Sequence, residues 1–342
     1  MDNHLKGLFG FEYINENSQN GQISYLQDSH FNQKIEIQIY KLKDFVVFFN
    51  GLVLCKKTGI PIRDSYFPEW YSNLIFESMN TPQKIEYEKL DDDEYIPLIG
   101  IWDNSFWHWM LEYLQRVIIA EKYGFEGKYI VYNDAHFKLA SLKLLGIDEK
   151  RLYIVDSSKN YFVKKLVLSE KIYPIDDRTL KIKYIQEIMR NKILSNFPDN
   201  ETNKHKRIYI TRGNAHNGRS IKNEDDVIEL LKKYNFEIIS LDNLTLEEQI
   251  NIFSNVNFLV GGHGGSTLHS LFMPKKSTII EFFSPNYINY GFNSIIELLE
   301  HDYYPLVSTY SFTNGSYYNG DINAPVEVPI ETLRVIIKNN LG

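Results

Sequence analysis

The residues of this sequence that are best suited to chemistry lie between positions 207 and 283. A strand-like run at 207–212 ends in Arg212, and Arg219 follows in the next loop. A second strand-like run leads into the glycine-histidine turn at 261–265, which precedes an apolar helical pattern. Free backbone N–H groups at a helix start point toward a bound ligand, and glycines let the ligand approach the backbone closely. Arginines beside such a turn predict a site for an anion, in particular a phosphate.

A second candidate for chemistry lies on a helix predicted over 105–122. His108 and Glu112 are four residues apart and therefore share one face of that helix. An imidazole beside a carboxylate can act as a general base with its orienting partner. Asp103, just ahead of the helix, is the next candidate base. The alternative is a histidine that caps a helix turn beside a surface glutamate.

Phosphate chemistry needs positive charge near the leaving group, from a divalent metal or from arginines and helix-start N–H groups. The acidic runs 91–93 and 225–226 are the candidates for a metal site. Neither follows an apolar strand, so both are predicted to be solvated carboxylates. Arg212 and Arg219 supply the second solution, and the sequence predicts a site without metal or other cofactor.

Some residues of the predicted phosphate site have a second interpretation. Arg212 could form a surface ion pair with an acid of the following helix, and His263 could be a packing residue. Ser266 and Thr267 are typical N-cap residues. Glu281, at the end of a strand-like run, could bind a ribose hydroxyl or close the edge of the sheet.

Composition favours an enzyme with two ordinary hydrophobic cores. The chain has 342 residues, of which 43% are hydrophobic. A net charge of -7 argues against a nucleic-acid binder, which needs clustered Lys and Arg. The single cysteine, Cys55, excludes an intrachain disulfide and a thiolate cluster. No apolar run is long enough to span a bilayer and the first residues do not read as a signal peptide, so we expect a cytoplasmic protein and leave peripheral membrane contact open.

The hydrophobic pattern predicts a β-rich start followed by two regions of alternating strands and helices. Asn50-Gly51 between apolar runs is a strong signal for a two-residue hairpin turn. The first alternating region has predicted strands at 95–99, 129–132 and 152–155 and helices at 105–122, 136–145 and 180–194. After a polar linker at 197–204, the second has strands near 208, 238, 258 and 279 and helices at 224–234, 246–253, 266–272 and 293–299. Such alternation predicts parallel sheets. A closing helix at 329–340 could cross back to the first domain.

The order of short motifs resembles glycosyltransferase family 61 over about residues 95 to 285. The motifs are Tyr209-Ile210-Thr211-Arg212, Arg219 with Asn223-Glu224, Leu246-Glu247-Glu248-Gln249, Gly262-His263-Gly264-Gly265, Phe272-Met273-Pro274, Ile280-Glu281, and upstream Phe106-Trp107-His108-Trp109 with Glu112 and Arg116. One departure is His269, which stands where the family more often has asparagine.

The resemblance implies an α/β protein of the GT-B class, in which two Rossmann-like domains face each other, here with an N-terminal β-rich extension. The expected domains are 1–195 for the acceptor, 204–310 for the nucleotide-sugar donor, and a tail with a closing helix at 311–342. The implied activity is inverting, metal-independent transfer of a sugar from a nucleotide donor, a UDP-sugar, to the hydroxyl of a glycan or glycolipid in surface polysaccharide assembly. The candidate catalytic residues are His108, Glu112 and Asp103, and the candidate donor-binding residues are Arg212, Arg219, Asn223, Glu224, His263, Gly264, Gly265, Ser266, Thr267 and Glu281. The alternatives are another GT-B nucleotide-sugar enzyme, such as an epimerase or a retaining transferase, or a catalytically silent glycan-binding protein.

Overall fold

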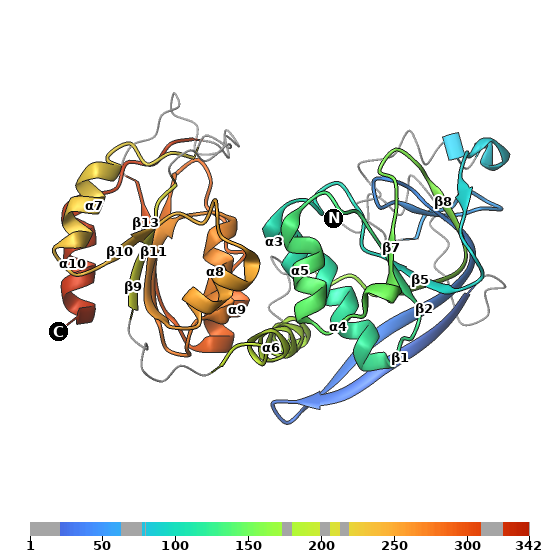
Figure 1. Cartoon of the computed structure of the whole chain (residues 1–342), viewed down its shortest axis with the longest axis horizontal. Coiled ribbons are helices and arrows are strands. Elements are labelled where there is room, and N and C mark those ends of the chain that lie inside the picture. Colours follow the sequence, from blue (N-terminus) through green and yellow to red (C-terminus); the bar gives the residue numbers. More distant parts are fainter. Residues whose placement is uncertain are drawn as a thin grey trace, which may run out of the picture. The chain divides into compact units, whose positions relative to one another are not determined.

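The computed structural model describes residues 21–62, 77–78, 80–172, 180–198, 206–212, 219–308 and 324–341. The chain divides into two compact units, one of Met1–Tyr173 with Thr179–Ile185 and one of Pro174–Arg178 with Gln186–Gly342. Each unit has one β-sheet with helices, so the protein is a mixed α/β protein with two sheets (Figure 1). The domain boundaries at 195, 204 and 311 stay predictions, and most of the expected linker lies outside the described residues.

The sheet of the first unit is mixed. Its order is β1-β2-β8-β5-β6-β7, with β3 paired to β2 and β4 paired to β8. The strands are β1 (Gly21–His30), β2 (Gln33–Val47), β3 (Val53–Cys55), β4 (Glu88–Lys89), β5 (Glu94–Pro97), β6 (Lys128–Val131), β7 (Leu152–Ile154) and β8 (Tyr161–Ser169). Strands β5, β6, β7 and β8 are parallel, as the alternating pattern predicted, but β2 pairs antiparallel with β8. The β-rich start is therefore part of the same sheet and not a separate extension.

The hairpin predicted at Asn50-Gly51 is present, but its loop is longer than two residues. The β2–β3 ladder ends at Val47 and Val53, so five residues connect the strands. Gly51 has a φ of 84°, and the Asn50 side chain accepts a hydrogen bond from the Leu52 amide at 3.1 Å. The turn residues are those expected, since a positive φ is easiest for glycine and an asparagine side chain can bond to the backbone two residues on.

One long helix of the first unit contains a π-helical turn. The helix predicted over 105–122 comprises α3 (Phe106–His108), the π-helical segment η3 (Trp109–Tyr113) and α4 (Leu114–Tyr123). The other helices of this unit are α5 (His136–Leu144) and the 3₁₀ turns η2 (Pro82–Lys84) and η4 (Glu149–Arg151). Such π-turns insert an extra residue into a helix and occur often at functional sites.

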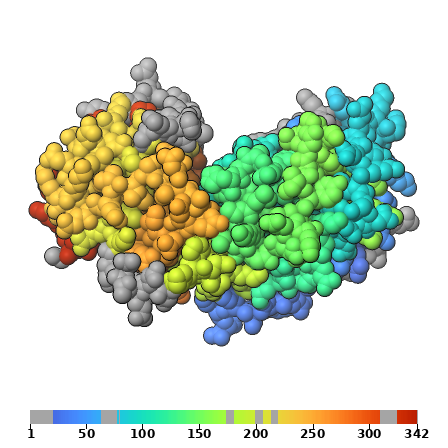
Figure 2. All heavy atoms as spheres, viewed as in Figure 1, coloured from blue at the N-terminus to red at the C-terminus, as the bar shows by residue number. Residues whose placement is uncertain are grey.

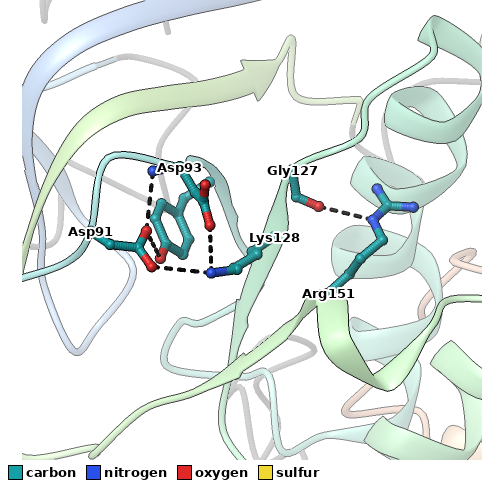
Figure 3. A network of polar contacts seen from close by, with 6 residues as sticks. Asp91, Asp93, Gly127, Lys128 and Arg151 are labelled. Atoms are coloured by element: carbon teal, nitrogen blue, oxygen red, sulfur yellow. Dashed lines mark hydrogen bonds and ion pairs between the residues drawn. The ribbon is translucent and has the colours of Figure 1, made fainter.

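The acidic run 91–93 is exposed, and Lys128 contacts two of its three carboxylates (Figure 3). The Lys128 ammonium is 3.1 Å from Asp91 and 2.5 Å from Asp93. The Tyr95 hydroxyl donates to Asp91 at 2.6 Å, and this bond is the main reason that the pKa of Asp91 is lowered. These carboxylates precede β5, at the amino end of a parallel strand, whereas ligands of such sheets bind at the carboxyl ends.

The sheet of the second unit is entirely parallel, with the order β10-β9-β11-β12-β13. The strands are β9 (Lys206–Ile210), β10 (Glu237–Ile239), β11 (Val256–Gly262), β12 (Thr278–Phe283) and β13 (Asp302–Val307). The helices are α6 (Leu180–Leu194), whose last part belongs to this unit, α7 (Glu224–Lys232), α8 (Leu246–Phe253), the 3₁₀ helix η6 (Gly265–Phe272), α9 (Asn293–Leu299) and α10 (Ile330–Leu341). Helices cover both faces of this sheet (Figure 1), and in the space-filling view the yellow and orange part of the chain forms most of the visible surface of this unit (Figure 2).

The closing helix α10 packs on the second unit, so the expectation that it crosses back to the first domain was wrong. Leu333 and Ile337 are fully buried in the core that also contains Val227 and Leu230 of α7. These two α10 residues are four apart, which gives the helix one apolar face that the second unit's own core covers. Within the described residues, no helix has the length and apolar content needed to cross a membrane.

His301, which immediately precedes β13, gives the second unit a pH dependence that can be tested. Its Nδ1 accepts from the Ser277 amide at 3.1 Å, and its Nε2 lies 3.1 Å from the Ser270 carbonyl oxygen, to which it donates. The ring is therefore neutral, and burial lowers the pKa of His301 below its ordinary value. A proton on Nδ1 would face the Ser277 N–H with no acceptor.

We expect the His301 contribution to stability to be complete above about pH 6.5 and to be lost as the pH falls below that value, since the unfolded state then binds the proton more readily. The loss of melting temperature between pH 7.5 and pH 5.5 should be smaller for His301→Gln than for the natural chain. Scanning calorimetry measures it, with His136→Gln as the control because His136 is exposed. Equal losses in all three proteins would show that the pKa of His301 does not differ between the folded and unfolded states.

Candidate functional site

A pocket opens at the carboxyl ends of the strands in the second unit. It has a volume of about 300 Å3, part of it open to solvent, and its lining comprises Arg212, Arg219, Ile221, Gly262, His263, Phe282, Ser284, Tyr287, Ala324 and Val326. The chain leaves β9 toward β10 on one side, and β11 lies on the other side of β9. Such a reversal of strand order is where doubly wound sheets bind their ligands.

Arg212 follows β9 and points into this pocket with carbonyl partners. Its guanidinium donates to the carbonyl oxygens of Arg219, at 3.2 Å, and His263. Among the described residues no carboxylate lies within ion-pair distance of this guanidinium, so the surface ion pair considered for Arg212 was wrong. Burial, and then the charge of Arg219, lower the pKa of Arg212 to about 10. The residue is still cationic at neutral pH, and an anionic ligand would complete its environment.

The glycines of the turn make room for Arg212. A Cβ atom on Gly264 would lie 2.1 Å from Nη2 of Arg212, and one on Gly262 would lie 3.1 Å from its Nε. The prediction from sequence was that these glycines admit a ligand to the backbone. In the structure they admit an arginine, which then presents its charge to the pocket.

Arg219 lines the same pocket, and both its guanidinium and that of Arg212 lie near Gly264. Its guanidinium carbon lies 5.0 Å from the centre of the Tyr287 ring, in a cation–π contact. Burial lowers the pKa of Arg219 from its ordinary value. Two guanidinium groups in one small pocket repel each other, which favours a ligand that carries more than one negative charge.

Asn223 and Glu224 hold the backbone around the site, and their contact with the donor stays a prediction. The amide of Asn223 donates to the Val328 carbonyl and accepts from the Val328 N–H, both at 2.9 Å. One carboxylate oxygen of Glu224 accepts from the Tyr209 hydroxyl at 2.8 Å, the Thr211 hydroxyl at 2.9 Å and the Arg212 amide at 3.2 Å. Glu224 thereby fixes the end of β9, from which Arg212 projects.

His263 follows β11 and contacts Glu281 of β12. Its Nδ1 is 2.8 Å from Oε1 of Glu281, and the other carboxylate oxygen accepts from the Tyr303 hydroxyl at 2.6 Å. Glu281 is 1% exposed, so it cannot reach a ribose directly. The direct sugar contact considered for Glu281 is replaced by a contact with the histidine.

Gly265, Ser266 and Thr267 begin η6, which is a 3₁₀ helix and not the expected α-helix. Its N-cap is Gly264, without a side-chain cap, so the N-cap role considered for the two hydroxyls was wrong. His269, the departure from the family pattern, is 1% exposed and stacks on a phenylalanine ring of α8 at 4.6 Å. The imidazole is a packing residue of the core.

His108 and Glu112 form the expected pair in the first unit. His108 Nδ1 is 3.1 Å from Glu112 Oε2, and the exposed fractions of the side chains are 23% and 4%. Trp102 lies 4.6 Å from the imidazole at an angle of 33° between the rings. The glutamate is therefore buried beneath a histidine that reaches solvent, which excludes the surface glutamate of the alternative interpretation. The π-helical turn spans Glu112, so local backbone geometry contributes to its position.

Asp103 is held by residues that the sequence did not single out. Oδ1 lies 2.8 Å from the ammonium of Lys138, and Oδ2 accepts from the Gly100 amide at 2.9 Å. Lys138 is completely buried and also pairs with Asp134 at 2.7 Å. Burial raises the pKa of Asp103 although the lysine opposes this shift. Both oxygens are engaged, so the geometry favours the His108–Glu112 pair over Asp103 as the base. The sequence signal for this buried lysine was its position in an apolar helix pattern, four residues after Asp134.

Within the described ranges, no three His, Cys, Asp or Glu side chains are placed to hold a metal ion together. The acidic pair 225–226 is exposed in the first turn of α7.

Arg116, part of the upstream motif, is buried and donates to the Pro97 carbonyl at 2.8 Å, so it fixes the end of β5.

Comparison with known proteins identifies the family. The model of the family described as Glycosyltransferase 61 matches residues 106–280, a span of just over half of the chain. The chain belongs to glycosyltransferase family 61. It is thus a member of a transferase family, and the matched span includes the His108–Glu112 pair and both arginines of the pocket, Arg212 and Arg219.

One partial sequence match and two weak structural matches to known proteins were also found. The chain is 30% identical over 79 residues to an EGF domain-specific O-linked N-acetylglucosamine transferase from Drosophila melanogaster, a match that covers 22% of this chain and 15% of that protein. An E. coli heptosyltransferase, WaaC with ADP, is 11% identical with a TM-score of 0.30, over 48% of this chain and 58% of that one. A flavo di-iron protein from Thermotoga maritima is also 11% identical, with a TM-score of 0.26 over 91% of each chain. Structural likenesses this weak carry no argument.

Proposed function

We propose that this family 61 protein is an inverting glycosyltransferase that moves a sugar from a UDP-sugar to a hydroxyl of a glycan or glycolipid. The observation that carries the proposal is the pair Arg212 and Arg219 in one pocket at the reversal of strand order. Two half-buried guanidinium groups, with no carboxylate partner for Arg212 among the described residues, suit a diphosphate. The likeness to a named N-acetylglucosamine transferase supports a sugar nucleotide as the donor class.

His108 and Glu112 serve the acceptor in this proposal. Nδ1 of His108 faces Glu112, so Nε2 is the nitrogen that takes the proton from the acceptor hydroxyl as its oxygen attacks the anomeric carbon. The bond between that carbon and the diphosphate oxygen breaks on the opposite face, which inverts the configuration. The GT-B arrangement of facing domains, predicted from the sequence, is the architecture that such a division of labour requires.

The leaving diphosphate is stabilised by the arginines and by His263 in place of a metal ion. We therefore expect turnover in excess EDTA to equal turnover with added magnesium or manganese. A thermal-shift screen of nucleotide sugars selects the donor, and incubation with candidate glycans under both conditions measures transfer. Loss of transfer in EDTA that a divalent ion restores would overturn metal independence and direct attention to the acidic runs. No stabilisation by any nucleotide sugar would overturn the proposed function itself.

The setting of the reaction follows from the same proposal. We assign the enzyme to the cytoplasm and to surface polysaccharide assembly, where sugar nucleotides and membrane-linked acceptors are both available. Fractionation of cells that produce the chain tests the location. Extraction of the surface polysaccharide from cells that lack the chain tests the acceptor, because an unchanged polysaccharide would favour a protein acceptor instead.

A further inference from the structure

Glu281 and Tyr303 lie behind His263, away from the opening of the pocket. The exposed fraction is 1% for the Glu281 side chain and 10% for the His263 side chain. The carboxylate bonds to the imidazole at 2.8 Å and to the tyrosine hydroxyl at 2.6 Å. The hydrogen-bonded path from this carboxylate toward the pocket therefore passes through the histidine ring.

The ring of His263 is held in one orientation. Phe283 stacks on it at 4.7 Å with an angle of 26°, and Phe292 meets it edge-on at 5.9 Å. Nδ1 is committed to Glu281. Nε2 has no partner among the described residues, and the side chain lines the pocket. The nitrogen available to a ligand is thus Nε2.

The Tyr303 hydroxyl acts as a donor in this chain of contacts. Burial, and then the charge of Glu281, raise the pKa of Tyr303, so the phenol keeps its proton. It donates that proton to Oε2 of Glu281, which leaves Oε1 for the N–H of His263. Such a carboxylate partner fixes the tautomer of an imidazole and stabilises its protonated form.

We infer that Glu281 and Tyr303 form a positioning relay that turns His263 into a cationic donor when a diphosphate enters the pocket. The inference rests on the proposed function. Arg212 and Arg219 line the same pocket as His263, Glu281 contacts Nδ1 of the imidazole, and the Tyr287 ring lies 5.5 Å from the imidazole ring. The negative charge of a bound diphosphate favours the cationic histidine, because its oxygens accept from both arginines and from Nε2–H. Binding should then be accompanied by uptake of a proton on His263.

Isothermal titration of UDP into the full chain tests the relay. At pH 7.5, titrations in two buffers that differ in ionisation enthalpy give the number of protons taken up. We expect more uptake for the natural chain than for Glu281→Gln, and an affinity ratio between pH 6 and pH 8 about tenfold larger for the natural chain, the usual gap between a charge-assisted and a neutral hydrogen bond. The titration of UDP itself is common to all the proteins and cancels in the comparison.

Tyr303→Phe is the second variant, and its effect should lie between those of the natural chain and Glu281→Gln. Tyr304→Phe is the matched control, since the neighbouring tyrosine on β13 donates to Asn340 instead. If Glu281 is merely structural, Glu281→Gln will have a lower melting temperature than the natural chain but the same proton uptake. That result would overturn the relay. If Glu281→Gln does not fold, unchanged uptake in Tyr303→Phe overturns it equally. A natural chain that binds no UDP overturns the proposed donor class, and the relay with it.

Discussion

Replacing Glu112 with glutamine is expected to lower kcat by about 100-fold or more while the affinity for the donor stays the same. The substitution keeps the size of the side chain and removes its charge, so His108 loses the carboxylate 3.1 Å from its Nδ1. Without that partner the orientation of the imidazole is less well defined. Glu112 is not among the residues that line the pocket of the second unit, which is why donor affinity should not change.

Steady-state transfer assays and donor titrations measure the two quantities separately. Glu126→Gln is the control, because Glu126 is exposed near the end of the same helix. The double variant His108→Ala with Glu112→Gln should be hardly slower than His108→Ala alone, since residues that act as a unit are not additive. A folded Glu112→Gln protein with near-normal kcat would assign the base to His108 alone or return it to Asp103.

Arg212→Ala should weaken the binding of UDP by about 10- to 150-fold and that of uridine by much less. The lost contact is a charge-assisted hydrogen bond to the diphosphate, worth about 1.5 to 3 kcal/mol. Uridine has no phosphate and serves as the internal reference. Isothermal titration of both ligands gives the two ratios.

Arg207→Ala is the matched control for this prediction. It removes an arginine from the same strand, β9, whose guanidinium donates to the Tyr234 carbonyl at 2.9 Å and does not line the pocket. Arg212→Lys should retain part of the UDP affinity, because the charge remains but the planar fork is lost. Equal losses for UDP and uridine in Arg212→Ala would place Arg212 outside the phosphate site.

Local patterns determined much of this protein. The alternation of apolar residues predicted all the strands of the second sheet except β13, and all its helices, because period and capping depend on neighbours in sequence. The spacing of His108 and Glu112 predicted their contact for the same reason, since four residues bring side chains onto one face of a helix. The arginine at the end of β9 and the glycine turn after β11 also became neighbours as predicted, since parallel strands bring their carboxyl ends to one edge.

Only the tertiary structure decided which polar side chains form hydrogen bonds within the protein. Asn223, Glu224 and Glu281 were all candidates for contact with the donor, and each forms hydrogen bonds with other residues of the chain. Their partners come from segments up to 105 residues away, and no sequence period connects them. The pairing of β12 with β13, which was not predicted, brings Tyr303 to Glu281. Burial enforces these contacts, because a polar group removed from water must find its hydrogen-bond partner within the protein.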